Sequence, residues 1–114
     1  MRHRAVALAA LVAALACGGE PEQATGADAA AARGKLVYSN VCTACHNADP
    51  RQSGVLGPEI AGAVQELIEA KVLRGEYPPG YAPKQPSAAM PKYEYLAKST
   101  ADLAAYLASV TSVK

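Results

Sequence analysis

Two cysteines and a histidine stand close together in the segment Cys42-Thr43-Ala44-Cys45-His46. Cysteines three positions apart face the same side of a helical turn, so both thiols can bond the vinyl groups on one edge of a porphyrin. The histidine that follows can place its imidazole under the iron. C-x-x-C-H is the attachment signature of c-type haem, so the segment predicts one covalent haem c and its iron, with Cys42 and Cys45 as attachment points and His46 as a ligand.

Other uses of these residues fit less well. A thioredoxin-like C-x-x-C needs a β-α-β sheet around it, and no segment of the sequence alternates with the period of a strand. A tetrahedral zinc site needs four ligands, and the other cysteine and histidine, Cys17 and His3, lie far toward the N-terminus. A disulfide between Cys42 and Cys45 is a further alternative, but it leaves His46 without a role.

The N-terminal end of the chain has the pattern of an export signal. Arg2 and Arg4 precede twelve residues without a polar side chain, at positions 5–16. A helix needs about 20 apolar residues to span a bilayer, so this run is too short for a membrane anchor and is typical of a cleaved signal peptide. We therefore expect residues 1–16 to be a signal peptide and the protein to be periplasmic.

Cys17 follows the expected cleavage site. The residues Ala14-Leu15-Ala16-Cys17 fit ordinary signal cleavage, and they also resemble the lipobox of bacterial lipoproteins. In the lipoprotein case Cys17 is lipidated and anchors the chain in a membrane; otherwise it is a free thiol at the new N-terminus. An unpaired exported cysteine is a liability, which favours the lipid anchor. Residues 17–28 have no large apolar side chain and are predicted to be a flexible tether.

Composition limits the classes of protein to which this chain can belong. Lys and Arg total 11 and Asp and Glu total 10, which argues against nucleic acid as a partner because nucleic-acid-binding proteins carry a basic excess. The chain has six Tyr but no Phe and no Trp, so its single domain, expected over residues 29–114, has few large side chains for a core. A haem would supply the missing apolar surface.

Three segments have the hydrophobic period of an α-helix, so the predicted fold class is all-α. We expect the first helix to begin with Asp28 as its N-cap and to run to about His46, and the second to cover 62–74. The third should begin with Ser99 as its N-cap, with Asp102 completing a variant of the capping box. The residues that repeat on the apolar faces of the first and third helices are Gly34, Tyr38, Val41, Cys45, Leu103, Tyr106, Leu107 and Val110.

A proline-rich loop follows the second helix. Tyr77 to Pro91 contains five prolines in fifteen residues, which forbids a helix and predicts a stiff loop. Once the expected signal peptide is removed, His46 is the only histidine and Met90 the only methionine, so two histidines of one chain cannot both bind the iron. A thioether is a soft, neutral ligand that favours Fe(II). We therefore predict that Met90, in this loop, is the distal ligand rather than part of the core.

From about Ala30 to Val110 the chain resembles the class I cytochromes c of the small bacterial type. The matching stretches are Gly34-Lys35-x-x-Tyr38-x-x-x-Cys42-x-x-Cys45-His46, Gly57-Pro58-x-Ile60-x-Gly62, Met90-Pro91 and the closing helix around Leu103, Tyr106 and Leu107. The resemblance implies a small cytochrome c fold, in which three main helices surround one covalently bound haem and the proline-rich loop carries the distal ligand. It also implies that Gly34 and Tyr38 cross the last helix near Leu103 and Tyr106.

The same resemblance assigns further residues to the haem site. It implies that the carbonyl of Pro58 accepts a hydrogen bond from His46 Nδ1, and that Ile60 packs on the haem face. A hydrogen bond of this kind fixes the imidazole and makes it a better donor to iron. The resemblance also supports Met90 as the distal ligand.

These expectations describe an electron carrier rather than an enzyme. With His46 and Met90 on the two faces of the iron, no small-molecule substrate is expected, and the function is one-electron transfer between Fe(III) and Fe(II) in the bacterial cell envelope. The expected partners are redox proteins, and a membrane through Cys17. Two alternatives stay open: an electron-transfer subunit of a larger oxidoreductase, and a five-coordinate haem for gas binding or peroxide chemistry. The last lacks an obvious distal acid or base.

Overall fold

The computed structural model describes residues 25–85 and 90–111. Their main helices are α1 (Gly26–Val41), α2 (Gln65–Ile68), which continues as the π-helix η2 (Glu69–Arg74), and α3 (Thr100–Ser109). Two short 3-10 helices, η1 (Cys42–Ala44) and η3 (Glu94–Leu96), lie between them. No strand occurs in the described residues, and the predicted all-α fold with three main helices is confirmed.

Several predicted features lie outside the described residues. These are the signal peptide 1–16, Cys17, and positions 86–89 of the proline-rich loop. α1 begins at Gly26, so it includes the end of the segment 17–28 for which the sequence predicts a tether. Within the ranges that the structure describes, no helix is long and apolar enough to cross a membrane.

The N-terminus of α1 is capped by a different residue from the one predicted. Thr25, not Asp28, is the N-cap, and its Oγ1 accepts a hydrogen bond from the Asp28 backbone N–H at 3.2 Å. The same hydroxyl donates to the Asp28 carboxylate at 2.7 Å. The prediction of Asp28 as the cap is therefore wrong. Asp28 instead lies in the first turn, where its negative charge interacts favourably with the helix dipole.

α1 ends at Val41 and does not continue to His46 as predicted. The chain tightens into the 3-10 turn η1, in which the Cys42 carbonyl accepts hydrogen bonds from the N–H groups of Cys45 (3.2 Å) and His46 (2.9 Å). A 3-10 turn is a common way to end an α-helix. The haem-attachment motif therefore occupies a tight turn at the end of α1 rather than a regular helix.

The second helix begins three residues later than predicted, at Gln65. Gly62 has a φ of +77°, a left-handed conformation that an α-helix does not accept, and its N–H donates instead to the Leu107 carbonyl of α3 at 2.8 Å. From Glu69 the helix widens into the π form of η2. Gly75, with a φ of +71°, ends the helix as predicted.

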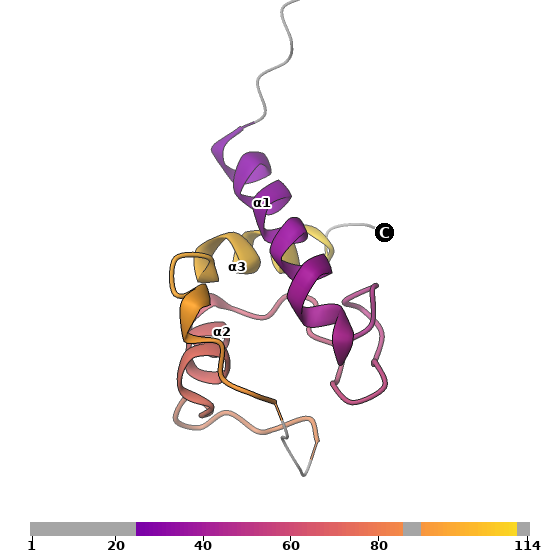
Figure 1. Cartoon of the computed structure of the whole chain (residues 1–114), viewed down its shortest axis with the longest axis vertical. Helices are drawn as coiled ribbons and strands as arrows, with labels where there is room; N and C mark the ends of the chain where they lie inside the picture. Colours follow the sequence, from indigo (N-terminus) through magenta and orange to yellow (C-terminus); the bar gives the residue numbers. More distant parts are fainter. Residues whose placement is uncertain (1–24, 86–89, 112–114) are drawn as a thin grey trace, which may run out of the picture.

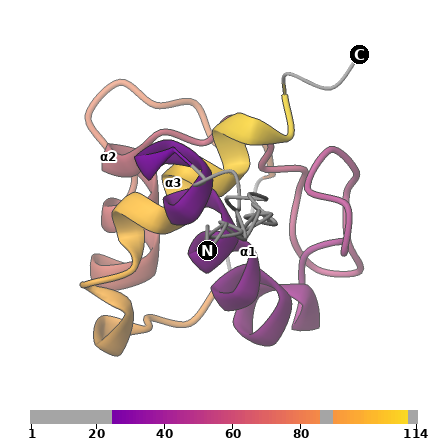
Figure 2. The same ribbon diagram turned by 90° about the horizontal axis from the view of Figure 1, so that it is seen from above.

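The crossing of α1 and α3 is the centre of the fold, as Figures 1 and 2 show from two directions. Gly34 lies so close to α3 that a Cβ at this position would overlap the Asp102 carbonyl and lie 2.9 Å from Tyr106 Cβ. Beside it, the rings of Tyr38 and Tyr106 pack with their centroids 5.5 Å apart. The predicted crossing of Gly34 and Tyr38 near Tyr106 is confirmed. The buried core consists of Tyr38, Ile68, Val72, Leu96, Leu103, Tyr106 and Leu107.

The capping box predicted for α3 does not form. Ser99 is the N-cap residue, but its side chain makes no capping hydrogen bond. The Asp102 carboxylate turns to α1 instead and accepts two hydrogen bonds from the Arg33 guanidinium, at 2.9 and 2.8 Å. Such a bidentate ion pair is stronger than the capping hydrogen bond that the carboxylate would make with a neutral backbone N–H group. The hydrogen bond from Arg33 also lowers the pKa of Asp102.

Candidate haem-binding site

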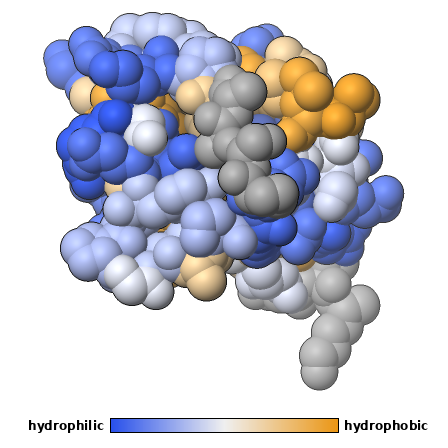
Figure 3. Space-filling view, turned by 90° about the horizontal axis from the view of Figure 1, so that it is seen from below, coloured by the Kyte–Doolittle hydropathy of each residue, from blue (hydrophilic) through white to orange (hydrophobic). Residues whose placement is uncertain are grey.

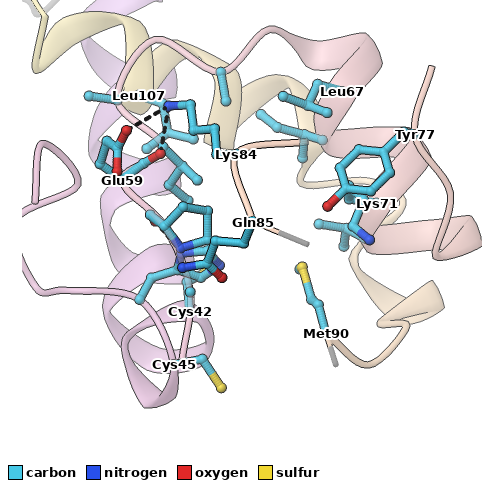
Figure 4. Close-up of a pocket in the computed structure, with 18 of the residues that line it drawn as sticks. Cys42, Cys45, Glu59, Leu67, Lys71, Tyr77, Lys84, Gln85, Met90 and Leu107 are labelled. Atoms are coloured by element: carbon cyan, nitrogen blue, oxygen red, sulfur yellow. Dashed lines mark hydrogen bonds and ion pairs between the residues drawn. The ribbon is translucent and has the colours of Figure 1, made fainter. Parts of the chain in front are cut away.

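A cavity of about 400 Å³ lies between the end of α1, the segment 56–64, the second helix and the proline-rich loop (Figure 4). This volume falls within the range of small-molecule and cofactor sites. The apolar side chains that line it are Val41, Leu56, Ile60, Val64, Leu67, Ile68, Val72, Leu96 and Leu107. The molecule's own side chains leave space for a large apolar group in the interior.

The apolar wall of the cavity continues to the surface. Leu56 and Val64 both line the cavity, yet they are 68% and 63% exposed. Val55, beside Leu56, is 93% exposed. Figure 3 shows one face of the molecule, mainly hydrophilic, with hydrophobic residues gathered at one corner. The cavity is therefore open on one side, so a cofactor bound in it would remain accessible to another protein.

The two thiols lie at the same end of the cavity: Cys42 is the first residue of η1, and Cys45 directly follows η1 (Figure 4). Cys42 and Cys45 are both partly buried, and neither forms a disulfide. Burial raises the pKa of the Cys42 thiol to about 11, so the thiol is uncharged at neutral pH. A thioether is uncharged as well, and attachment at this position therefore places no new charge in the interior.

His46 is held in one orientation by the chain that passes over it. Its Nδ1 lies 2.9 Å from the Pro58 carbonyl oxygen. A carbonyl oxygen can only accept, so Nδ1 donates the proton and Nε2 carries the lone pair that a metal would bind. The neighbouring Gly57 allows this close approach, because a Cβ there would lie 2.5 Å from both Nδ1 and Cε1 of the ring.

Met90 and Ile60 complete the predicted set. Met90 is partly buried, and Figure 4 shows its sulfur pointing into the cavity from the proline-rich loop. Ile60 lines the cavity, and its N–H is held by the Pro50 carbonyl at 2.9 Å. The structure thus brings six predicted site residues to one cavity, while their roles toward haem stay predictions. These residues are Cys42, Cys45, His46, Pro58, Ile60 and Met90.

An ion pair joins the loop that carries Met90 to the loop that carries Pro58. Lys84 Nζ donates to the Glu59 carbonyl at 2.8 Å and lies 3.4 Å from the Glu59 carboxylate. Ser53 Oγ donates to the same carboxylate at 3.0 Å. Hydrogen bonds from the backbone, Ser53 and Lys84 lower the pKa of Glu59. The sequence alone does not point to this pair, because no pattern links residues 25 positions apart.

A second cation at the cavity sits on an aromatic ring. Lys71 Nζ lies 4.2 Å from the centre of the Tyr77 ring, and Tyr77 stacks on Tyr81 with centroids 5.4 Å apart. All three side chains line the cavity. Attraction between an ammonium group and a ring face holds the charge in place. Sequence analysis missed this group, for which the only signal is the Tyr content of the loop.

The arrangement fits haem c. Two thiols stand at one end for attachment, an imidazole presents its lone pair, a thioether enters from another loop, and the remaining wall is apolar. In the ranges 25–85 and 90–111, no group of three or more His, Cys, Asp or Glu side chains could hold a metal ion alone.

The chain belongs to the cytochrome c family, because the family model described as Cytochrome c matches residues 31–111. Proteins of this family bind haem c with its iron and transfer electrons to redox partners. The predictions of a class I c-type cytochrome and of a covalent haem c are thereby confirmed. Searches of curated proteins and of solved structures found no match.

Proposed function

We propose that this protein is a one-electron carrier whose haem iron is bound by His46 on one face and by Met90 on the other. The observation that supports this most directly is that both side chains line one cavity, from two different loops. The Pro58 carbonyl occupies Nδ1 of His46, which leaves Nε2 for iron. With both axial positions taken, the iron would have no position for a substrate.

The bound haem supplies an iron that alternates between Fe(III) and Fe(II). The residues of the chain would tune this exchange in three ways. The bond from His46 Nδ1 to Pro58 makes the imidazole a stronger donor, while the Met90 thioether favours Fe(II) and raises the reduction potential. The apolar wall excludes water, which keeps the reorganisation of the surroundings small when the charge on the iron changes.

We also propose that the protein works in the periplasm, held to a membrane by a lipid on Cys17. Support comes from the apolar run at 5–16 and the lipobox-like residues before Cys17. An anchored tether would confine electron exchange to partners near one membrane and raise their effective concentration. Cys17→Ser should release the protein from the membrane fraction without changing the haem spectrum. Persistent membrane association of this variant would contradict the lipid anchor.

The ligand assignment is tested by Met90→Ala. The variant should lose the sixth ligand, bind CO rapidly when reduced, and have a lower reduction potential, because the thioether no longer favours Fe(II). Val64→Ala is the matched control, since it removes apolar atoms from the same cavity but no donor atom. If Met90→Ala keeps the wild-type spectrum and potential, Met90 is not the ligand. If the wild-type protein is already open to CO, a gas-binding or peroxide-reacting haem replaces the carrier.

A further inference from the structure

The backbone on both sides of His46 is held by hydrogen bonds. The His46 N–H donates to the Cys42 carbonyl at 2.9 Å. On one side, the Cys45 carbonyl accepts from the N–H groups of Leu56 (3.2 Å) and Gly57 (3.0 Å). On the other side, the Asn47 carbonyl accepts from the hydroxyl of Tyr38 at 2.5 Å. The bond to Cys42 lies within the C-x-x-C-H motif, and the bonds to Cys45 come from the adjoining loop. The bond to Asn47 comes from a side chain in the last turn of α1.

Tyr38 is built into the crossing of α1 and α3. Its side chain is 1% exposed, and its ring packs on Tyr106 of α3. Among the described residues, it is the one side chain that donates to the backbone of the segment 45–47. Burial raises the pKa of Tyr38 to about 12, so the hydroxyl keeps its proton, and remains a donor, at neutral pH. The ring of a phenylalanine would suffice for the packing on Tyr106, whereas the hydrogen bond to Asn47 requires the hydroxyl.

We propose that Tyr38 is a positioning residue for the proximal ligand: its hydroxyl fixes the Asn47 carbonyl and thereby the direction of the His46 imidazole. This rests on the proposed function, in which His46 binds the iron. The imidazole has little freedom, because Gly57 lies so close that a Cβ there would be 2.5 Å from the ring, and because Nδ1 is bonded to Pro58. A small shift of the segment 45–47 would therefore weaken the bond between His46 and Pro58.

The weakened bond has a predictable electronic effect. An imidazole whose Nδ1–H makes a weaker hydrogen bond to the Pro58 carbonyl is a poorer donor to iron. A poorer donor stabilises Fe(III) less, so the reduction potential rises. The Tyr38 hydroxyl thus connects the crossing of the two long helices to the strength of the bond between His46 and iron.

The test compares two holoproteins that each lose one hydroxyl. Tyr38→Phe keeps the ring but removes the bond to Asn47. Tyr106→Phe is the matched control, because it keeps the other ring of the pair and removes a hydroxyl for which no hydrogen bond to a described residue is found. The reduction potential should rise in Tyr38→Phe and stay at the wild-type value in Tyr106→Phe.

A second readout reports on the imidazole itself. In the reduced protein, exchange of the His46 Nδ1 proton with solvent, followed by NMR, should accelerate by up to about tenfold in Tyr38→Phe, because this variant loses the one hydrogen bond that Tyr38 makes to Asn47. The backbone amide of Leu107, a buried residue of α3, serves as the internal reference for global opening. A purely structural role would accelerate both protons by the same factor, whereas a positioning role accelerates the Nδ1 proton more.

Equal potentials and equal exchange in the two variants would overturn the proposal. If Tyr38→Phe does not fold with haem, the Tyr38 hydroxyl proton is measured by NMR in the wild-type holoprotein instead. A slowly exchanging proton, close in space to residues 46 and 47, supports the proposal. A rapidly exchanging proton overturns it. Failure of the proposed function has a different signature. In that case the wild-type protein lacks the low-spin spectrum of an iron bound by His46 and Met90, whatever the variants do.

Discussion

Replacement of Gly34 by alanine tests the crossing that positions the whole site. A Cβ at this position would overlap the backbone carbonyl of Asp102, which cannot move unless α3 moves with it. Overpacking of this kind costs about 1–3 kcal/mol, and the rigid backbone obstacle places Gly34→Ala near the upper end. Alanine recovers about 1 kcal/mol through its better helix propensity. The expected net loss is about 2 kcal/mol in the free energy of unfolding.

Gly26→Ala in the same helix is the matched control. A Cβ at Gly26 would meet no atom within 4 Å, so only the helix propensity and the unfolded-chain entropy change. This variant should be as stable as the wild type or more stable, by up to about 1 kcal/mol. Guanidinium denaturation of both holoproteins, followed by circular dichroism and by the haem absorption, measures the difference. A Gly34→Ala protein that is at least as stable as Gly26→Ala would refute the close helix contact.

Two further predictions concern charge. Lys71→Met should lower the reduction potential, because the ammonium group over Tyr77 at the cavity wall opposes the extra positive charge of Fe(III). Lys98→Met, outside the cavity lining, is the control, and equal potentials in the two variants would contradict this role. The hydrogen bonds from Arg51 lower the pKa of Asp49 to about 2. The ionised Asp49 carboxylate therefore stabilises the folded state above about pH 4, and this stabilisation is lost as the pH falls toward 2. Asp49→Asn should therefore flatten the decline in unfolding free energy over that range, measured by denaturation between pH 2 and 6; curves that run parallel to the wild type would count against it.

The features that sequence analysis predicted are those encoded by neighbouring residues. The C-x-x-C-H segment spans five positions, and the period of the apolar residues identifies the faces of α1 and α3. Gly34 and Tyr38 lie four residues apart on one face of α1. Their contact with α3 was predicted from the family resemblance, which rests on this short motif. The position of Gly75 at the end of η2 is similarly local.

The errors arise where a distant residue competes with a local one, or where two local residues are equally suitable. Asp102 has the sequence spacing of a capping box, but Arg33, 69 residues away, takes its carboxylate. At the start of α1, both Thr25 and Asp28 are good N-caps by type, and the sequence does not rank them. The bond between Tyr38 and Asn47 has no sequence signature either, because a tyrosine can be present for the packing of its ring alone, without a hydrogen bond from its hydroxyl.

The most direct test of the central claim is the visible absorption spectrum of the purified wild-type protein, oxidised and then reduced. With His46 and Met90 on the iron, we predict sharp low-spin bands in the reduced form. The oxidised form should show the weak long-wavelength band of sulfur-to-iron charge transfer. A high-spin spectrum without that band would contradict the assignment of Met90. A protein without any haem absorption would contradict the site as a whole.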